Sequence, residues 1–547
     1  MSQAPVNCDV LVIGSGAAGL SAAISAKLSG ADVLVVEKAA VFGGTTARSG
    51  GWCWIPLSPQ ARAAGIKDSE DDVLAYLRNE IGSALNEGLA RAFLRAGPEM
   101  LALYESKTSL RLEIGTDFPD YHPDTPGGRT GGRALSTREM RAQDLGPRLA
   151  SLAPPLKALM LAGMSIGSGT ELKHFFRASR SPRSAWFVLK RMLAHASDIV
   201  RHGRGMRLVN GNALAARLGK SVDDLSVPMW LSSPAKELLM DNVRVAGALV
   251  ERDGKTVEIR ARKGVILASG GFPHDVARRC ALFAHAAAAD EHFPLAPETN
   301  RGDGLLMAEN AGAILGAGLA QNAAWAPVSR GVWPDGTSVT YPHFVDRGKP
   351  GIIAVTALGR RFVNEADSYH DVVSALIGSR NASGHSEAWF IADSRAVGRY
   401  GLGLARPFPF PKAHWLKSGY LLKARSLADL ARKAGIDPQA LMETVGNFNS
   451  HAVHGQDPQF GRGSTAYNRF QGDADHRPNP ALGPLDRPPY YAVRIRTGDI
   501  GTFEGILTDE HTRALDASGQ PVPGLYAAGN DMRSVMAGYY PGAGITL

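Results

Sequence analysis

The chain has 547 residues, which is long enough for two or more domains with cores of their own. Its composition, 44% hydrophobic and 20% charged, is that of an ordinary soluble globular protein. Its three cysteines stand at no ligand-like spacing, which argues against a disulfide framework or a zinc site and indicates a reducing compartment. No run of about 18 apolar residues predicts a transmembrane helix. The N-terminal sequence lacks the positively charged start of a signal peptide, so we expect a cytoplasmic location.

The N-terminal region has the pattern of a dinucleotide-binding βαβ unit. Residues 9–13 are apolar and β-branched, as in a strand buried on both faces, and residues 20–28 favour a helix. A second strand is predicted at residues 32–36, and Glu37 follows directly after it. The strand, the helix and the acidic residue all lie where such a unit requires them.

The turn between the first strand and the helix reads GSGAAG, and each of its glycines has its own predicted role. Gly14 permits the tight turn, Gly16 lets the backbone approach a pyrophosphate, and Gly19 lets helix and strand pack closely. The helix N-terminus directs free N–H groups and a positive dipole end at the phosphates. The Glu37 carboxylate is placed to accept hydrogen bonds from an adenosine ribose.

The segment after Glu37 reads KAAVFGGTTARSGG, and its small residues and hydroxyls allow a bulky cofactor to lie against the backbone. The chain thereby resembles the flavoprotein family of fumarate reductases and 3-ketosteroid dehydrogenases, in which this loop contacts the pyrophosphate and the flavin. The resemblance implies FAD. The loop lacks the histidine that binds flavin covalently in relatives such as succinate dehydrogenase, so we expect non-covalent FAD. The FAD-binding residues implied here are Gly14, Ser15, Gly16, Ala17, Ala18, Gly19, Glu37, Lys38, Gly43, Gly44, Thr45, Thr46, Ser49, Gly50 and Gly51.

Later segments extend the same resemblance. Residues 264–271 are predicted to form a strand that passes near the cofactor, and residues 524–530 the strand and turn that close on the flavin ribityl. Asp303 lies at a helix start, where an N-cap is its ordinary structural role. The FAD-binding residues implied in these segments are Asn212, Ala213, Ala268, Ser269, Gly270, Asp303, Gly529, Asn530, Gly544 and Leu547.

The resemblance covers residues 9–547 and implies an α/β fold. We expect a Rossmann-like FAD-binding domain, discontinuous over residues 1–290 and 490–547, with an inserted α+β substrate domain at residues 291–489. Residues 293–489 are richer in Pro and Gly loops, with short helices predicted at residues 426–431 and 441–449. The chain becomes strand-like again from Tyr490.

The residues expected to bind substrate differ from those of a dicarboxylate reductase. Fumarate reductases need cationic clamps for carboxylates. Their pattern places a proton-donating arginine after an RFxNE stretch, where this chain has Tyr369. Residues 499–505 also lack the fumarate-type histidine. Fumarate reduction is therefore disfavoured.

Three tyrosines fall in contexts that resemble 3-ketosteroid dehydrogenases. Desaturation beside a ketone removes an α-proton while a hydride leaves the β carbon for flavin N5, and negative charge develops on the carbonyl oxygen. The resemblance assigns the donors to that oxygen to the Tyr540 hydroxyl and the Gly544 N–H. It makes Tyr369 the base, assisted by Tyr121. A phenol of ordinary pKa near 10 needs a hydrogen-bond partner or a positive field for this role.

Several alternatives stay open at this point. A half-buried tyrosine is often only a packing residue; Tyr539 competes with Tyr540, and His122 competes with Tyr121. The resemblance favours 1,2-desaturation of a 3-ketosteroid, with an external electron acceptor such as a quinone. The alternatives are desaturation at another ring position or of another cyclic ketone, a fumarate-type reductase of α,β-unsaturated acids, and an inactive flavin-binding or electron-carrying protein.

The net charge of +8 comes with no nucleic-acid motif. Much of the excess lies at residues 174–207, which we interpret as a solvated helix face. The alternative is an interfacial helix that makes a peripheral membrane contact, because apolar residues such as Trp186 and Leu193 are interspersed.

The chain stops at Leu547, where relatives continue into a helix whose N-terminus points at the flavin pyrimidine. Either the sequence is a fragment or its FAD site is weakened. Without that helix we expect weaker FAD binding and a lower flavin potential.

Overall fold

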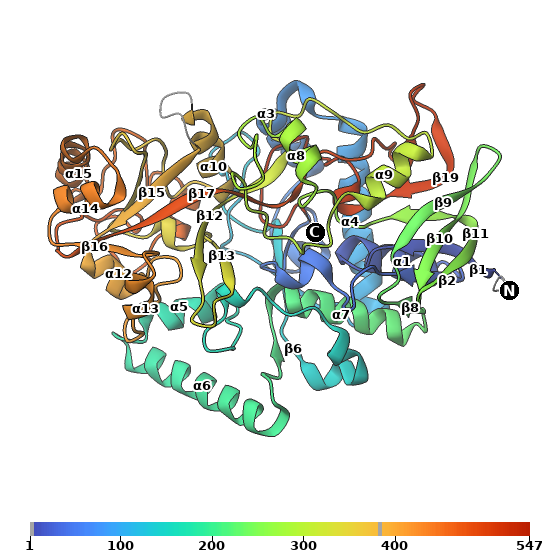
Figure 1. Ribbon diagram of the computed structural model, residues 1–547, viewed down its shortest axis with the longest axis horizontal. Coiled ribbons are helices and arrows are strands. Elements are labelled where there is room, and N and C mark those ends of the chain that lie inside the picture. Colours follow the sequence, from blue (N-terminus) through green and yellow to red (C-terminus); the bar gives the residue numbers. More distant parts are fainter. Residues whose placement is uncertain (1–4, 381–385, 547) are drawn as a thin grey trace.

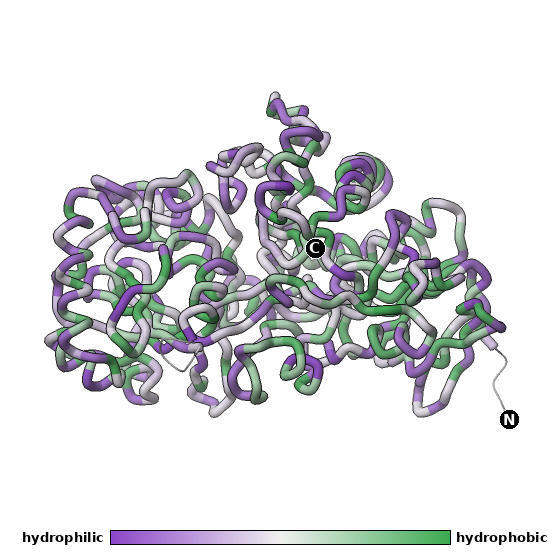
Figure 2. Tube along the Cα trace, turned by 90° about the horizontal axis from the view of Figure 1, so that it is seen from above, coloured by the Kyte–Doolittle hydropathy of each residue, from purple (hydrophilic) through white to green (hydrophobic). Residues whose placement is uncertain are grey.

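The computed structural model describes residues 5–380 and 386–546. Two large β-sheets occupy opposite ends of an elongated molecule, and the C-terminus lies between them (Figure 1). Hydrophobic segments run through the interior of both ends, and hydrophilic segments lie mainly at the periphery (Figure 2). The substrate and cofactor sites are expected where the two ends meet.

The first sheet is mainly parallel, with the strand order β18-β19-β11-β1-β2-β8 and the β9-β10 hairpin added to β11. The last residues of four parallel strands are in register: Ile13 of β1 faces Val36 of β2 and Leu267 of β11, which in turn faces Ala527 of β19. The residues that follow these strands therefore meet at one edge of the sheet, where α/β folds bind ligands. The strands are β1 (Val6–Ile13), β2 (Val33–Val36), β8 (Met229–Trp230), β9 (Ala235–Asp241), β10 (Arg244–Arg252), β11 (Lys255–Leu267), β18 (Arg513–Leu515) and β19 (Pro521–Ala527).

Helices cover both faces of this sheet, which explains why its strands are continuously apolar. On one face, Val12 packs in a core with residues of α1 (Ala17–Leu28) and α7 (Asn210–Asp224). On the other face, Leu11 packs in a core with residues of α9 (Asp303–Asn310). The predicted βαβ unit is confirmed.

The second sheet is antiparallel, with the order β13-β12-β17-β15-β14 and β16 paired to β17. Its strands are β12 (Ala323–Val332), β13 (Ser338–Pro342), β14 (Ile352–Val355), β15 (Glu387–Ala392), β16 (Leu422–Ala424) and β17 (Tyr490–Thr502). The associated helices are α10 (Tyr369–Gly378), α12 (Ser394–Tyr400), α13 (Ala413–Lys417), α14 (Leu427–Ala434), α15 (Pro438–Ala452) and α16 (Ala466–Gln471).

The helices predicted at residues 426–431 and 441–449 are α14 and α15. The first begins directly after its cap, Ser426, and extends three residues beyond the predicted end; the second begins earlier, after its cap Asp437, and also ends later. The strand that begins at Tyr490 is β17. It pairs within the second sheet, and the chain rejoins the first sheet at β18. The division into residues 1–290 with 490–547 and residues 291–489 stays a proposal.

Two smaller sheets and several helices complete the fold. The antiparallel set is β3 (Trp52–Trp54), β4 (Leu112–Ile114) and β5 (Ala134–Thr137), and β6 (Met140–Arg141) pairs with β7 (Arg207–Leu208). The remaining helices are α2 (Pro59–Ala63), α3 (Glu70–Ile81), α4 (Glu87–Lys107), α5 (Thr170–Arg177), α6 (Pro182–His202) and α8 (Val276–Leu282).

The basic stretch of residues 174–207 contains the second half of α5 and all of α6. In Figure 1, α6 runs along the lower edge of the molecule, away from both sheets. Apolar side chains on it are exposed to solvent, among them Trp186, Leu193 and Val200. The helix is therefore amphipathic but leaves a large part of its apolar surface uncovered.

Candidate functional site

A cavity of about 990 Å³ extends from the carboxyl edge of the first sheet to the second sheet. Residues that follow β1, β2, β11 and β19 form one end of it, and residues of α5, α10 and α16 form the other. A cavity of this size is at the upper end of ligand and cofactor sites. It joins the expected cofactor region to the three predicted catalytic tyrosines.

The glycine turn after β1 has the geometry predicted for dinucleotide binding. Gly14 has φ +114°, and a Cβ there would lie 2.2 Å from the carbonyl oxygen of Ala268. A Cβ on Gly19 would lie 2.0 Å from the carbonyl oxygen of Gly14, so Gly19 serves close helix–strand packing. A Cβ on Gly16 would meet no protein atom closer than 3.7 Å, and Gly16 lines the cavity. The protein does not need a glycine there for its own packing, which fits a ligand that approaches the backbone.

The acidic end of β2 is fixed beside this turn. Glu37 Oε2 accepts hydrogen bonds from the Ser15 N–H at 3.0 Å and from its hydroxyl at 2.5 Å, and Oε1 accepts from the Ala39 N–H. The next residue, Lys38, pairs with Asp303 at 2.5 Å. Asp303 is therefore not an N-cap: Gly302 precedes the helix, and the Asp303 carboxylate is directed to Lys38 across the cavity wall.

The threonine-rich loop forms a short 3₁₀-helix, Gly44–Arg48. The Thr46 hydroxyl accepts a hydrogen bond from the Ala17 N–H at 2.9 Å, which joins the loop to the start of α1. A Cβ on Gly51 would lie 2.2 Å from the backbone of Asn210, so this glycine is required by the protein itself. The loop thus presents backbone and hydroxyl groups to the cavity.

Most of the predicted FAD-binding residues line one continuous wall. These are Gly14, Ser15, Gly16, Ala17, Ala18, Glu37, Lys38, Gly44, Thr45, Thr46, Ser49, Gly50, Gly51, Ala268, Ser269, Gly270, Asp303, Gly529, Asn530 and Gly544. Four do not line it and act in packing instead: Gly19, Gly43, Asn212 and Ala213. Leu547 lies outside the described residues.

Asp531, which the sequence analysis missed, organises the part of this wall that follows β11. Its carboxylate accepts hydrogen bonds from the Gly271 N–H at 2.8 Å and from the Ser269 N–H and hydroxyl. Burial raises the pKa of Asp531, and these donors oppose the rise. Its position directly after Asn530, at the end of the predicted turn, was the available signal. The wall as a whole fits FAD.

At the other end of the cavity the three predicted tyrosines converge. The Tyr121 hydroxyl donates a hydrogen bond to the Tyr369 hydroxyl at 3.1 Å. The Tyr121 and Tyr540 rings stack with centroids 5.3 Å apart, and the Tyr369 and Tyr540 rings meet edge to face at 5.4 Å. All three line the cavity, whereas Tyr539 does not. The structure thus brings together residues that are up to 419 positions apart.

Local structure fixes the position of Tyr369, the first residue of α10. The Ser368 hydroxyl caps the helix by accepting the Asp371 N–H at 3.2 Å. Before the cap, Arg361 forms two hydrogen bonds to Glu365, at 2.8 and 2.7 Å, and both side chains are buried. The RFVNE stretch therefore anchors the segment that carries Tyr369 rather than entering the cavity.

Tyr540 and the glycine turn after it are also closely constrained. Gly544 has φ +89°, and a Cβ there would lie 1.8 Å from the carbonyl oxygen of Trp52. Burial raises the pKa of Tyr540, while the hydroxyls of Tyr369 and Thr546 and the N–H of Gly544 counteract the rise. The Gly544 N–H therefore lies close to the Tyr540 hydroxyl oxygen, and both residues line the cavity.

Burial raises the pKa of Tyr121 and of Tyr369 well above the ordinary value. A buried phenol of this kind ionises only if a positive charge stands near. Arg347, which the sequence analysis missed, is the nearby positive charge: its guanidinium carbon lies 5.9 Å from the Tyr369 ring centroid. It also opposes the effect of burial, which raises the pKa of the neighbouring Tyr467 to about 12. Arg347 is fully buried and donates to the carbonyls of Phe344 and Asp367. Among the described residues, no carboxylate oxygen lies within 4.0 Å of it.

His122 does not share the role of Tyr121. Its ring nitrogens bond to Glu80 at 2.5 Å and to Asp371 at 2.9 Å, and it does not line the cavity. Burial disfavours the charged imidazolium, but the two carboxylates outweigh burial and raise the His122 pKa to about 11. His122 is therefore a positively charged link between α3 and α10.

Comparison with known proteins agrees with this geometry. The model of the FAD binding domain family matches residues 9–547. The 4-oxocyclohex-2-ene-1-carboxylate 5-dehydrogenase of Sinomonas cyclohexanicum is 40% identical over 541 residues, which are 98% of this chain and 91% of that protein. The 3-oxosteroid 1-dehydrogenase of Mycobacterium tuberculosis is 36% identical over 558 residues, 98% and 95% of the two chains. A similar solved structure is that of 3-ketosteroid delta1-dehydrogenase from Sterolibacterium denitrificans, a crystal structure in complex with 1,4-androstadiene-3,17-dione. It superposes with a TM-score of 0.90 at 34% identity, and the match covers 98% of this chain and 96% of that one.

Proposed function

Since the chain belongs to the FAD binding domain family and is an FAD-dependent oxidoreductase, we propose that it introduces a C=C bond beside a ketone. The observation that carries the proposal is the convergence of Tyr121, Tyr369 and Tyr540 with the Gly544 N–H at one end of the cavity. No carboxylate side chain belongs to this group of four.

The proposed chemistry follows from the donors and the base. The Tyr540 hydroxyl and the Gly544 N–H donate to the ketone oxygen and stabilise the negative charge that develops there. Tyr369, as phenolate, takes the proton from the α carbon, with Arg347 balancing the phenolate charge and Tyr121 donating to the phenolate oxygen. Bound FAD supplies the acceptor for the hydride that leaves the β carbon. The electron pair of the broken α C–H bond then forms the C=C bond.

For the substrate, the first candidate is a 3-ketosteroid desaturated at its 1,2 bond. The supports are the 36% identical steroid dehydrogenase and the steroid-bound structure that superposes closely. The cavity beyond the tyrosines is lined by aromatic side chains such as Phe118, Phe176 and Phe470, which suit a large apolar ligand. The second candidate is a monocyclic keto acid, supported by the 40% identical cyclohexene carboxylate dehydrogenase.

The test is turnover of 4-androstene-3,17-dione and of 4-oxocyclohexanecarboxylate with an artificial electron acceptor. Acceptor reduction with either ketone, and a desaturated product, is the expected result. Absence of acceptor reduction and of flavin bleaching with both ketones would reject the proposal. A separate control adds fumarate to protein whose flavin has been chemically reduced. Reoxidation of that flavin, with reduction of fumarate, would point to the reductase alternative.

We also propose an external acceptor such as a quinone, and a cytoplasmic location with peripheral membrane contact through α6. The supports for the contact are the exposed Trp186 and Leu193 among the basic residues of this helix. No helix in residues 5–380 and 386–546 is long and apolar enough to cross a membrane. We expect the protein to co-sediment with anionic liposomes, and we expect this binding to be lost when Trp186 and Leu193 are replaced by Ser. If none of the unaltered protein co-sediments, the contact is rejected.

A further inference from the structure

Positive side chains in the cavity wall differ in whether a carboxylate already neutralises them. Lys38 pairs with Asp303 and Arg177 pairs with Asp475. Lys173 is exposed to solvent. Lys349, between Arg347 and the β14 strand, is different because its side chain is buried in the wall.

Two of the three N–H donors of the Lys349 ammonium have hydrogen-bond partners among the described residues. Its ammonium donates to the carbonyls of Gln471 and Gly472, each at 2.6 Å, and lies 5.4 Å from the centroid of the Phe176 ring. Among the described residues, no carboxylate oxygen lies within 4.0 Å of it. Because an ammonium group has three N–H donors, one remains for a group inside the cavity.

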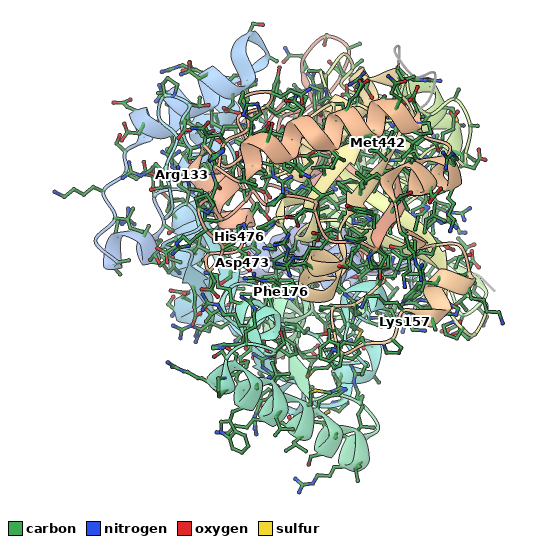
Figure 3. The ribbon with its side chains drawn as sticks, turned by 90° about the vertical axis from the view of Figure 1, so that its left-hand side faces the viewer. Arg133, Lys157, Phe176, Met442, Asp473 and His476 are labelled. Atoms are coloured by element: carbon green, nitrogen blue, oxygen red, sulfur yellow. The ribbon has the colours of Figure 1, made fainter. Side chains whose placement is uncertain are left out.

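The nearest acidic residues in this part of the wall accept hydrogen bonds from other groups, and among the described residues Asp346 Oδ1 has no partner. Asp473 pairs with Arg399 and accepts the Tyr400 hydroxyl at 2.6 Å. Asp346 accepts from His343 and from the Gly403 N–H, each at 2.8 Å. Figure 3 labels Phe176 and Asp473 in this part of the molecule.

Lys349 is connected to the tyrosines through residues of α16. Gln471, whose carbonyl accepts from Lys349, is four residues after Tyr467 on α16, and its amide donates to the Tyr467 hydroxyl at 2.8 Å. The Tyr467 ring is 4.8 Å from the Tyr121 ring. Lys349 and Tyr467 line the same cavity as Tyr121, Tyr369 and Tyr540, so one ligand in it can contact both the tyrosines and the ammonium.

We propose that the Lys349 ammonium binds a carboxylate carried by the ketone substrate on the side away from the carbonyl group. The inference rests on the proposed function and narrows its substrate class to keto acids. A single buried cation with one free donor matches a monoanion and recognises it by a charge-assisted hydrogen bond. The carboxylate belongs either to a one-ring keto acid or to a steroid with an acidic side group, and the experiment separates the two.

The test measures binding by the change in flavin absorbance of the FAD-loaded protein. The ligands are 4-oxocyclohexanecarboxylate and 3-oxo-4-androstene-17-carboxylate, each beside its methyl ester. A charge-assisted bond predicts that the preferred acid binds on the order of 10- to 100-fold more tightly than its ester. Whichever acid shows this preference identifies the source of the carboxylate. In Lys349→Met the preference is expected to disappear while ester affinity stays within about threefold. In the control Lys107→Met, which removes an exposed ammonium outside the cavity, it is expected to persist.

Three results would overturn the proposal. They are equal binding of acid and ester to the unaltered protein, an acid preference that survives in Lys349→Met, and an equal loss of acid and ester affinity in that variant, which would show that Lys349 only supports the loop. The proposed function fails by a separate result: neither the acids, the esters nor 4-androstene-3,17-dione reduces the bound flavin.

Discussion

Replacing Arg347 by Met removes a buried positive charge beside the proposed base Tyr369. The guanidinium carbon is 5.9 Å from the Tyr369 ring centroid. With the phenolate charge placed at the ring centroid and an effective dielectric constant of about 20, the two unit charges interact by about 3 kcal/mol, which corresponds to about two pKa units. The positive charge favours the phenolate, so its removal raises the pKa of Tyr369 by about that amount.

The assay is the pH dependence of flavin reduction by substrate in anaerobic stopped flow. The rate rises with pH as Tyr369 ionises, and the rising limb is expected about two pH units higher in Arg347→Met than in the unaltered protein. Arg347→Lys keeps the positive charge, so its rising limb is expected to lie close to that of the unaltered protein. FAD content and the thermal midpoint are measured in parallel, because Met leaves the carbonyls of Phe344 and Asp367 without their donor. An unchanged limb in a folded, FAD-loaded Arg347→Met variant would refute the electrostatic role of Arg347.

Three other changes test separate parts of the site. Tyr369→Phe is expected to slow flavin reduction about 10²- to 10⁴-fold, the usual contribution of a general base. Tyr104→Phe, which removes a similarly buried hydroxyl outside the cavity, is expected to leave that rate unchanged; equal rates in the two variants would contradict the assignment of the base. Gly544→Ala places a Cβ 1.8 Å from a backbone carbonyl at φ +89°, so we expect loss of ketone binding, measured by flavin absorbance, together with a lower thermal midpoint. Gly16→Ala fills space that only a ligand would use. The amount of FAD bound per chain is therefore expected to fall, with little change in the thermal midpoint of the apoprotein. Full FAD content would show that the cofactor does not approach this residue.

The cofactor half of the fold was predictable because its signals are local. The GSGAAG turn, the strand before it and Glu37 after the next strand lie within one short segment, and the register of β1, β2 and β11 brings them to one edge. Gly14 and Gly19 have the backbone roles expected of them. The cofactor prediction, FAD, is confirmed by the family to which the chain belongs.

The substrate half was predictable only where the family resemblance supplied positions. Tyr121, Tyr369 and Tyr540 come from distant parts of the chain, and nothing in the local sequence shows that their rings meet. Arg347 and Lys349 give no motif, since their importance depends on burial without a carboxylate partner. That property arises only when residues 346–349 lie against Asp367 and the end of α16.

For Asp303 a local sequence pattern gave a prediction that was wrong. Its position at a helix start predicted an N-cap, but the left-handed Gly302 takes the capping position and the carboxylate turns to Lys38. The Asp303 carboxylate forms a stronger interaction with the neighbouring Lys38 ammonium than it would with backbone N–H groups of the helix. Such long-range competition is not visible in a sequence pattern.

Desaturation of a ketone by the FAD-loaded protein can be measured in a single anaerobic turnover, with a cyclic ketone in excess over enzyme-bound FAD. We expect bleaching of the flavin and one equivalent of α,β-desaturated ketone per FAD reduced, identified by mass spectrometry. Flavin that stays oxidised with 4-androstene-3,17-dione and with 4-oxocyclohexanecarboxylate, in protein with full FAD content, would contradict it.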